Sequence, residues 1–278
     1  MYPDIESLLP PVPLGTSGET LAKAFNKKGW HWWPSYSAIA TRSVNGRNAC
    51  INLGPCNTGC PQGAKSSTDI TYIPKAKKLG LTLMPETTVS KVIVENSRAV
   101  GVHAYDAVGQ PKKIFAKNIV LAASSLGSAQ ILLNSRSKDA PNGLGNSSGQ
   151  LGRNLMVHPL GYVEGIFPEA LDTDIGPQGC MLYSLQHYRV GNADHNLGYM
   201  MHALRGTGPV EAALSAYDKR KLKLGTELYS SFAEFYRKQL VISIICEDLP
   251  QEHNKIELDV NSSDRFGIPG IKFSYRLS

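Results

Sequence analysis

The feature that most constrains the fold is the apolar run at residues 118–123, Asn-Ile-Val-Leu-Ala-Ala, which leads into small residues at 124–128 and then into a helix-like segment at 129–134. A continuous apolar run of this length is typical of a strand buried on both faces, as in a parallel sheet covered by helices. Small residues at the turn allow a ligand or another backbone to approach closely. We therefore predict a mixed α/β fold, with both α/β and α+β character.

The composition excludes several classes of protein. The chain has 278 residues, 42% of them hydrophobic, which excludes a disordered chain and allows for about two domains of roughly 150 residues each. The formal net charge of +6 is spread over small basic groups near polar or acidic positions, so we expect a mixed charged surface and no nucleic-acid partner. No apolar run approaches the roughly 20 residues of a membrane-spanning helix, and we predict no transmembrane segment. No targeting signal assigns a compartment.

Shorter patterns indicate how the rest of the chain is organised. Prolines and glycines at residues 3–18 favour an extended arm, and apolar residues at helical spacing follow at residues 18–28. Alternating segments separated by turn residues then predict a small antiparallel meander. A further helix is predicted at residues 69–79, and strands are predicted at residues 81–84, 89–94, 99–105, 113–116, 240–246, 255–258 and 271–275.

The pattern changes near residue 158, where short alternating segments, Gly/Pro turns and aromatic residues begin to dominate. We predict a first domain at residues 1–157, which includes a Cys-rich loop at residues 42–66. A second domain at residues 158–278 is predicted to be a mostly antiparallel sheet with helices packed on it.

Three cysteines in the Cys-rich loop form the clearest candidate for chemistry. Cys50, Cys56 and Cys60 stand at spacings of six and four, and Pro61 follows the last of them. Thiolates hold iron–sulfur clusters, and three ligands suit a three-iron cluster. Zinc ordinarily takes a fourth protein ligand, and the nearest flanking candidate, His31, lies nineteen residues upstream of Cys50. A cluster, zinc, a disulfide and three inert thiols all remain open at this point.

Four ordered segments, at residues 59–65, 69–74, 120–135 and 143–159, together resemble the glucose-methanol-choline (GMC) oxidoreductases. The similarity continues through the C-terminal segments, at residues 247–250, 254–259 and 268–275. It implies that the first domain is part of an FAD-binding, Rossmann-like domain. It also implies that the second domain is part of a substrate-binding domain.

The resemblance also implies positions for the flavin. Residues 120–128 match the strand and turn that help to form the wall of the FAD site, which makes Ala123, Ser124 and Ser125 candidate cofactor-binding residues. Ser124 and Ala129 replace a Gly and a Pro that are common in the family, and both substitutions keep the side chains small.

Two further roles follow from the resemblance. Val89 matches a valine that contacts the adenine through its backbone. The spacing of Cys50, Cys56 and Cys60 is similar to that of FAD-dependent sugar dehydrogenases whose catalytic subunit holds a 3Fe-4S cluster. In those enzymes the cluster relays electrons from the reduced flavin onward.

The chain also departs from the family pattern. It has no Gly-x-Gly-x-x-Gly segment of the kind that binds the FAD pyrophosphate, and no match to the family's active-site His with its His or Asn partner, so its catalytic residues are unassigned. We therefore expect the chain to be an internal fragment of a longer enzyme.

The function predicted from the sequence is that of an FAD-dependent dehydrogenase. It would oxidise a CH–OH group of an alcohol or sugar and pass electrons to an acceptor, for which an electron-acceptor protein is one candidate. Two alternatives remain. One is an oxidase that reduces oxygen and has no cluster. The other is a non-catalytic scaffold that binds a partner.

Overall fold

The computed structural model describes residues 9–54, 56–188 and 197–277, and the chain forms two compact units. Unit 1 consists of Met1–Leu81 and His158–Glu247, and unit 2 of Thr82–Val157 and Asp248–Ser278. Each unit thus combines two separate segments of the chain. The predicted division between residues 157 and 158 falls on one of the borders between the units.

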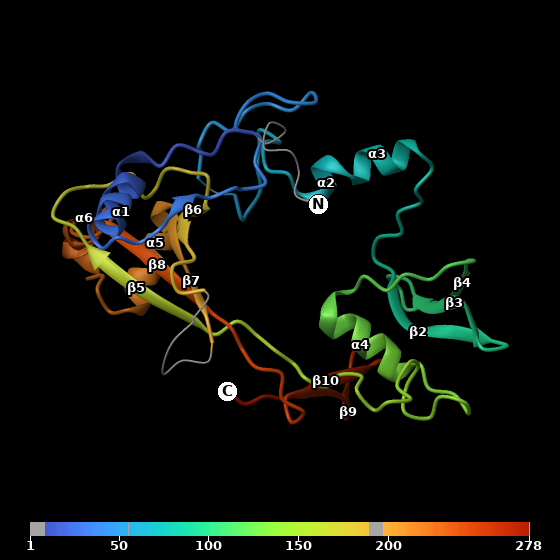
Figure 1. Cartoon of the computed structure of the whole chain (residues 1–278). Coiled ribbons are helices and arrows are strands. Elements are labelled where there is room, and N and C mark those ends of the chain that lie inside the picture. Colours follow the sequence, from blue (N-terminus) through green and yellow to red (C-terminus); the bar gives the residue numbers. More distant parts are fainter. Residues whose placement is uncertain (1–8, 55, 189–196, 278) are drawn as a thin grey trace. The chain divides into compact units, whose positions relative to one another are not determined.

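Unit 1 is built on a five-stranded sheet in the order β1-β6-β7-β8-β5, and every neighbouring pair is antiparallel (Figure 1). The antiparallel sheet predicted for the second domain is therefore confirmed in type. Its central register places Leu182 opposite Ala203, and Ala203 opposite Ile242. The strands are β1 (Trp33–Pro34), β5 (Leu160–Ile166), β6 (Gly179–Ser184), β7 (Tyr199–Arg205) and β8 (Gln239–Cys246).

Helix α1 (Gly15–Lys27) supplies the core of unit 1. Its buried residues Leu21, Ala22 and Phe25 belong to one cluster with Leu182 and Ala203 of the sheet. Burial of each large apolar side chain contributes about 1.5–3 kcal/mol, so this face anchors the helix. The helix predicted at residues 18–28 is confirmed, although it begins three residues earlier.

The other helices of unit 1 are short. The single helix predicted at residues 69–79 is replaced by two helices that meet at Tyr72. No helix among the described residues is long and apolar enough to cross a membrane. The short helices are α2 (Thr68–Thr71), α3 (Ile73–Lys78), α5 (Pro209–Asp218), the 3-10 helix η2 (Gly225–Glu227) and α6 (Leu228–Ala233).

Unit 2 contains the predicted meander, a helix and a C-terminal hairpin (Figure 1). The turn between the first two strands has positive φ angles at Asn96 (51°) and Ser97 (59°), as a tight type I′ hairpin requires. The elements are β2 (Thr88–Glu95), β3 (Arg98–Tyr105), β4 (Pro111–Phe115), α4 (Ser124–Asn134), β9 (Lys255–Ser263) and β10 (Pro269–Ser274).

Two predicted strands do not form. Residues 118–123 and 81–84 have no strand structure, and Val120 is 84% exposed. A strand needs a neighbouring backbone to satisfy its N–H and C=O groups, and no described strand pairs with either segment. The helix after the apolar run is confirmed, and it begins at Ser124.

Candidate functional site

The Cys-rich loop is irregular, as predicted, and a short buried segment fixes its two arms. The N–H of Cys50 donates to Ala40 O (2.8 Å), and the N–H of Ala40 donates to Ala64 O (2.8 Å). The N–H of Ser66 donates to Ala38 O (2.8 Å). Ala40 and Ala64 are 0% and 1% exposed, so this pairing lies in the interior. The segment at residues 38–40 therefore holds the two sides of the loop, at Cys50 and at residues 64–66, in fixed positions.

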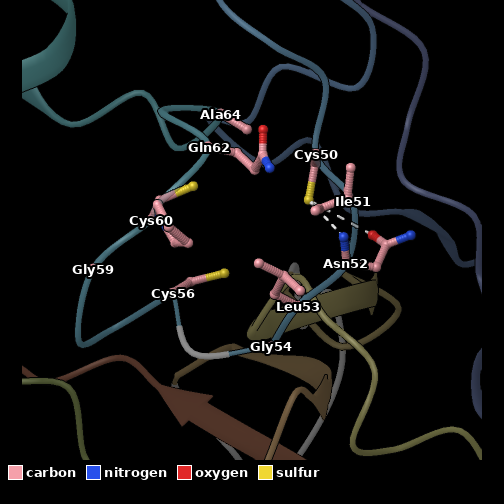
Figure 2. A pocket seen from close by; sticks show the side chains of 11 residues that line it. Cys50, Ile51, Asn52, Leu53, Gly54, Cys56, Gly59, Cys60, Gln62 and Ala64 are labelled. Carbon is pink, nitrogen blue, oxygen red and sulfur yellow. Dashed lines mark hydrogen bonds between the residues drawn. The ribbon is translucent and has the colours of Figure 1, made fainter.

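The arrangement brings the three predicted cysteines together. Cys50, Cys56 and Cys60 line one cavity of about 300 Å³, open mouth included, and Figure 2 shows their sulfurs directed into the shared space. All three are free thiols, so a disulfide among them is excluded in this structure. No three His, Cys, Asp or Glu side chains in the described ranges are close enough together to hold a single metal ion. The thiols surround a space rather than converge on a point.

Backbone N–H groups point at two of the sulfurs. The N–H of Asn52 donates to Cys50 Sγ (3.4 Å), two residues away in the chain. The N–H of Gln178 donates to Cys56 Sγ (3.2 Å) from a loop more than a hundred residues downstream. Hydrogen bonds to the cysteine sulfurs are among the features that tune iron–sulfur clusters.

Cys60 has the richest backbone environment of the three. The turn that follows it closes with a bond from Gly63 N to Cys60 O (3.1 Å), and Gly63 takes a φ of 64°. The N–H of Lys65 lowers the pKa of the Cys60 thiol; burial opposes this effect, and the N–H groups of residues 62–64 add to it. The backbone of this turn thus lowers the pKa of the Cys60 thiol.

Sequence reasoning did not identify Gln178 or the donors at residues 62–65. The Pro-Gln-Gly run after Cys60 is a turn signal that could have suggested the second group. Nothing local marks Gln178, because its position depends on the tertiary fold.

The candidate flavin residues lie in unit 2. Val89 and Ala123 line one cavity of about 1250 Å³, open mouth included, together with Val102, Ile119 and Ile131. Ser124 and Ser125 follow directly as the exposed first residues of α4 and are not among the lining residues. The structure therefore brings two of the four predicted residues together in one apolar-walled space, of a character that suits a ring system.

Ser124 has an unusual backbone. Its φ is 61°, in the left-handed region that costs little for glycine and more for other residues. This conformation supplies a physical reason for the glycine that is common in the family at the matching position.

Comparison with known proteins bears on what these sites serve. The family model described as GMC oxidoreductase matches residues 16–160, which is more than half of the chain. The chain belongs to the GMC oxidoreductase family. The match includes the Cys-rich loop, the meander and α4.

Curated relatives agree with this assignment. The chain is 33% identical to 2-methyl-1,2-propanediol dehydrogenase of Mycolicibacterium austroafricanum, over 96% of this chain and 49% of the relative. It is 27% identical to the fructose dehydrogenase large subunit of Gluconobacter japonicus, over 95% of this chain and 48% of the relative. It is 26% identical to paromamine 6'-oxidase of Streptomyces fradiae, over 96% of this chain and 47% of the relative. The chain spans about half the length of these relatives.

These matches support the oxidoreductase prediction, and the family implies FAD as the cofactor. The relatives include both dehydrogenases and oxidases by name. The names of the relatives therefore do not distinguish oxygen from another electron acceptor.

Proposed function

We propose that the whole protein is an FAD-dependent dehydrogenase that oxidises a CH–OH group of an alcohol or sugar. Its electrons leave through a 3Fe-4S cluster held by Cys50, Cys56 and Cys60. Family membership and the diol and sugar dehydrogenases among the relatives support the reaction. The observation that carries the cluster is the set of three thiols that face one cavity, with backbone N–H donors at the sulfurs of Cys50 and Cys56.

The layout of the thiols suits a cluster better than a single ion. In a cluster, each thiolate binds a different iron, so the sulfurs stand around the metal core and apart from one another. A single zinc ion needs its ligands to meet at one point, and no such group occurs among the described side chains. The N–H donors at the sulfurs of Cys50 and Cys56 would offset part of the negative charge of the thiolates.

The flavin part of the proposal assigns Val89 and Ala123 to the wall of the nucleotide site, with Ser124 and Ser125 at the adjoining helix start. Bound there, FAD would supply the hydride acceptor for oxidation of the carbinol carbon to a carbonyl, with the hydroxyl proton passing to a base. The apolar side chains that line this cavity would exclude water from a ring placed against them. The base is not assigned to any residue of this chain.

Kinetics of the full-length protein test this function. Under anaerobic conditions, a panel of diols, simple alcohols and sugars is added, and bleaching of the flavin is followed by stopped flow. Reoxidation of the flavin by an artificial one-electron acceptor is then compared with reoxidation by oxygen. We expect rapid bleaching, rapid turnover with the acceptor, and slow turnover with oxygen.

Two cysteine variants sharpen the test. Cys56→Ser should leave flavin reduction intact and slow electron transfer to the acceptor. Cys246→Ser changes a free thiol on β8 that does not line the cavity of the three cysteines, and it should change neither step. Fast oxygen turnover unaffected by Cys56→Ser would support the oxidase instead. Absence of flavin reduction by every donor would support the non-catalytic scaffold.

A further inference from the structure

Arg47 stands beside the Cys60 turn because a tight hairpin presents it there. Val44 and Arg47 exchange two backbone hydrogen bonds (3.1 and 3.0 Å). The two residues between them, Asn45 and Gly46, have φ angles of 52° and 75°. An Asn-Gly pair with two positive φ angles is the preferred sequence of a type I′ turn, so the position of Arg47 is encoded locally.

The half-buried guanidinium of Arg47 binds the segment that follows Cys60. Its Nε donates to Gly63 O (3.1 Å), and its Nη2 donates to Ala64 O (2.5 Å) and to Ser66 Oγ (2.8 Å). The planar fork of arginine suits two neighbouring carbonyl oxygens in a way that a lysine ammonium does not. Arg47 thereby orients two consecutive peptide groups.

The segment that Arg47 holds forms the Cys60 side of the cavity. The N–H of Gly63 donates to Cys60 O (3.1 Å), which closes the turn after the cysteine. Cys60 and Ala64 line the same cavity. The guanidinium therefore places a positive charge on the backbone of this turn, and linked hydrogen bonds polarise one another.

We propose that Arg47 is a positioning residue of the redox centre. Its guanidinium fixes the peptide groups of Gly63 and Ala64 in the turn after Cys60 and places a positive charge there, and it thereby raises the reduction potential of the cluster bound beside it. Hydrogen bonds to the sulfurs and net charge are among the properties that set the potentials of iron–sulfur clusters. This inference rests on the cluster proposed above, and it adds a residue outside the ligand set that tunes it.

The experiment is a redox titration of the full-length protein, followed by electron paramagnetic resonance of the cluster. Arg47→Gln removes the charge and the fork, while Arg47→Lys keeps the charge but loses the fixed fork. At a fixed solution potential we expect Arg47→Gln to lower the reduced-to-oxidised ratio about tenfold, which for a one-electron couple is about 59 mV. Arg47→Lys should fall between this variant and the wild type. Both should retain the wild-type iron content, which separates tuning from simple loss of the site.

Arg42→Gln is the matched control, because Arg42 is exposed in the same loop and makes no hydrogen bond or ion pair with the described residues. Its potential should equal that of the wild type. A loaded Arg47→Gln protein with unchanged potential would overturn the inference. If Arg47→Gln loses its iron, Arg47→Lys decides, and a wild-type potential in that variant also overturns it. A wild-type protein without iron would refute the proposed cluster itself. An iron-loaded protein whose reduction potential does not change with Arg47 would refute only the role of Arg47.

Discussion

Removal of the Asp172 carboxylate should destabilise unit 1, because this residue caps a helix from far away in the chain. Asp172 Oδ2 accepts from Thr16 N (3.0 Å), and Oδ1 accepts from Ser17 N (2.8 Å). These donors belong to the first turn of α1, whose N–H groups have no partner within the helix. Leu14, the residue at the N-cap position, has no side chain that could cap them. Gly15 leaves room for the carboxylate, since a Cβ there would lie 1.8 Å from Asp172 Oδ2.

The size of the effect follows from these contacts. Loss of an N-cap side chain costs about 0.5–2 kcal/mol, and a hydrogen bond to a charged group contributes about 1.5–3 kcal/mol when well buried. One of the two bonds is exposed, so the lower part of the range for hydrogen bonds to a charged group applies. We expect Asp172→Ala to lower the free energy of unfolding at pH 7 by about 2 kcal/mol, and Asp172→Asn by about 1 kcal/mol, because the amide retains one acceptor.

The effect should also depend on pH. Burial alone would raise the pKa of Asp172, but hydrogen bonds from Ser17 and Thr16 outweigh it and lower the pKa below its ordinary value. A carboxylate with a lowered pKa stabilises the fold above its unfolded-state pKa of about 3.9, and this contribution disappears as the pH falls through the lower folded-state value. The difference in the free energy of unfolding between wild type and Asp172→Asn should therefore be largest at neutral pH and should disappear at acid pH.

Urea denaturation followed by tryptophan fluorescence measures this directly. All three tryptophans, at positions 30, 32 and 33, lie in unit 1, so the signal reports on the unit that contains α1. Glu19→Gln, an exposed change in the same helix, is the control and should shift the midpoint little. An Asp172→Ala protein as stable as the control at pH 7 would contradict the capping role of Asp172. A stability difference between wild type and Asp172→Asn that persists unchanged at acid pH would contradict it as well.

Two further predictions concern residues with positive φ angles, Ser124 and Gly206. Ser124→Gly should raise the free energy of unfolding of unit 2 by about 0.5–1 kcal/mol in calorimetry, because relief of roughly 1–2 kcal/mol of left-handed strain exceeds the added freedom of the unfolded chain. Ser124→Val should lower the free energy of unfolding of unit 2, and equal stability of the two variants would contradict the strain assigned to Ser124. Gly206→Ala should lower both the stability of unit 1 and the iron content of the whole protein. Gly206 has a φ of 87°, and a Cβ there would lie 2.3 Å from the Cα of Gln178, whose N–H donates to Cys56 Sγ. Wild-type iron content in a folded Gly206→Ala protein would show that Gln178 does not support the site.

The parts of the fold that could be predicted from the sequence are those with local causes. The periodicity of α1 and the turn between the first two strands of the predicted meander depend on neighbours in the chain, and both form as expected. The apolar run at residues 118–123 was predicted wrongly as a strand, since hydrophobicity indicates burial but cannot supply a partner backbone. No described strand pairs with it.

The candidate sites divide in the same way. The spacing of the cysteines identified three side chains that line one cavity. The donor at Cys56 was missed, because Gln178 reaches this sulfur through a contact 122 residues apart. Arg47 was missed because it binds carbonyl oxygens, which no sequence motif records. For the flavin, the resemblance named four residues, of which Val89 and Ala123 share a cavity.

The proposed enzyme passes its electrons through a cluster on Cys50, Cys56 and Cys60. The iron and flavin content of the full-length protein, purified without oxygen, tests this, together with the absorption spectra of the wild type and of Cys56→Ser. We expect one flavin and about three irons per chain in the wild type, with the iron lost and the flavin kept in the variant. Flavin without iron in the wild type, or iron unchanged by Cys56→Ser, would contradict it.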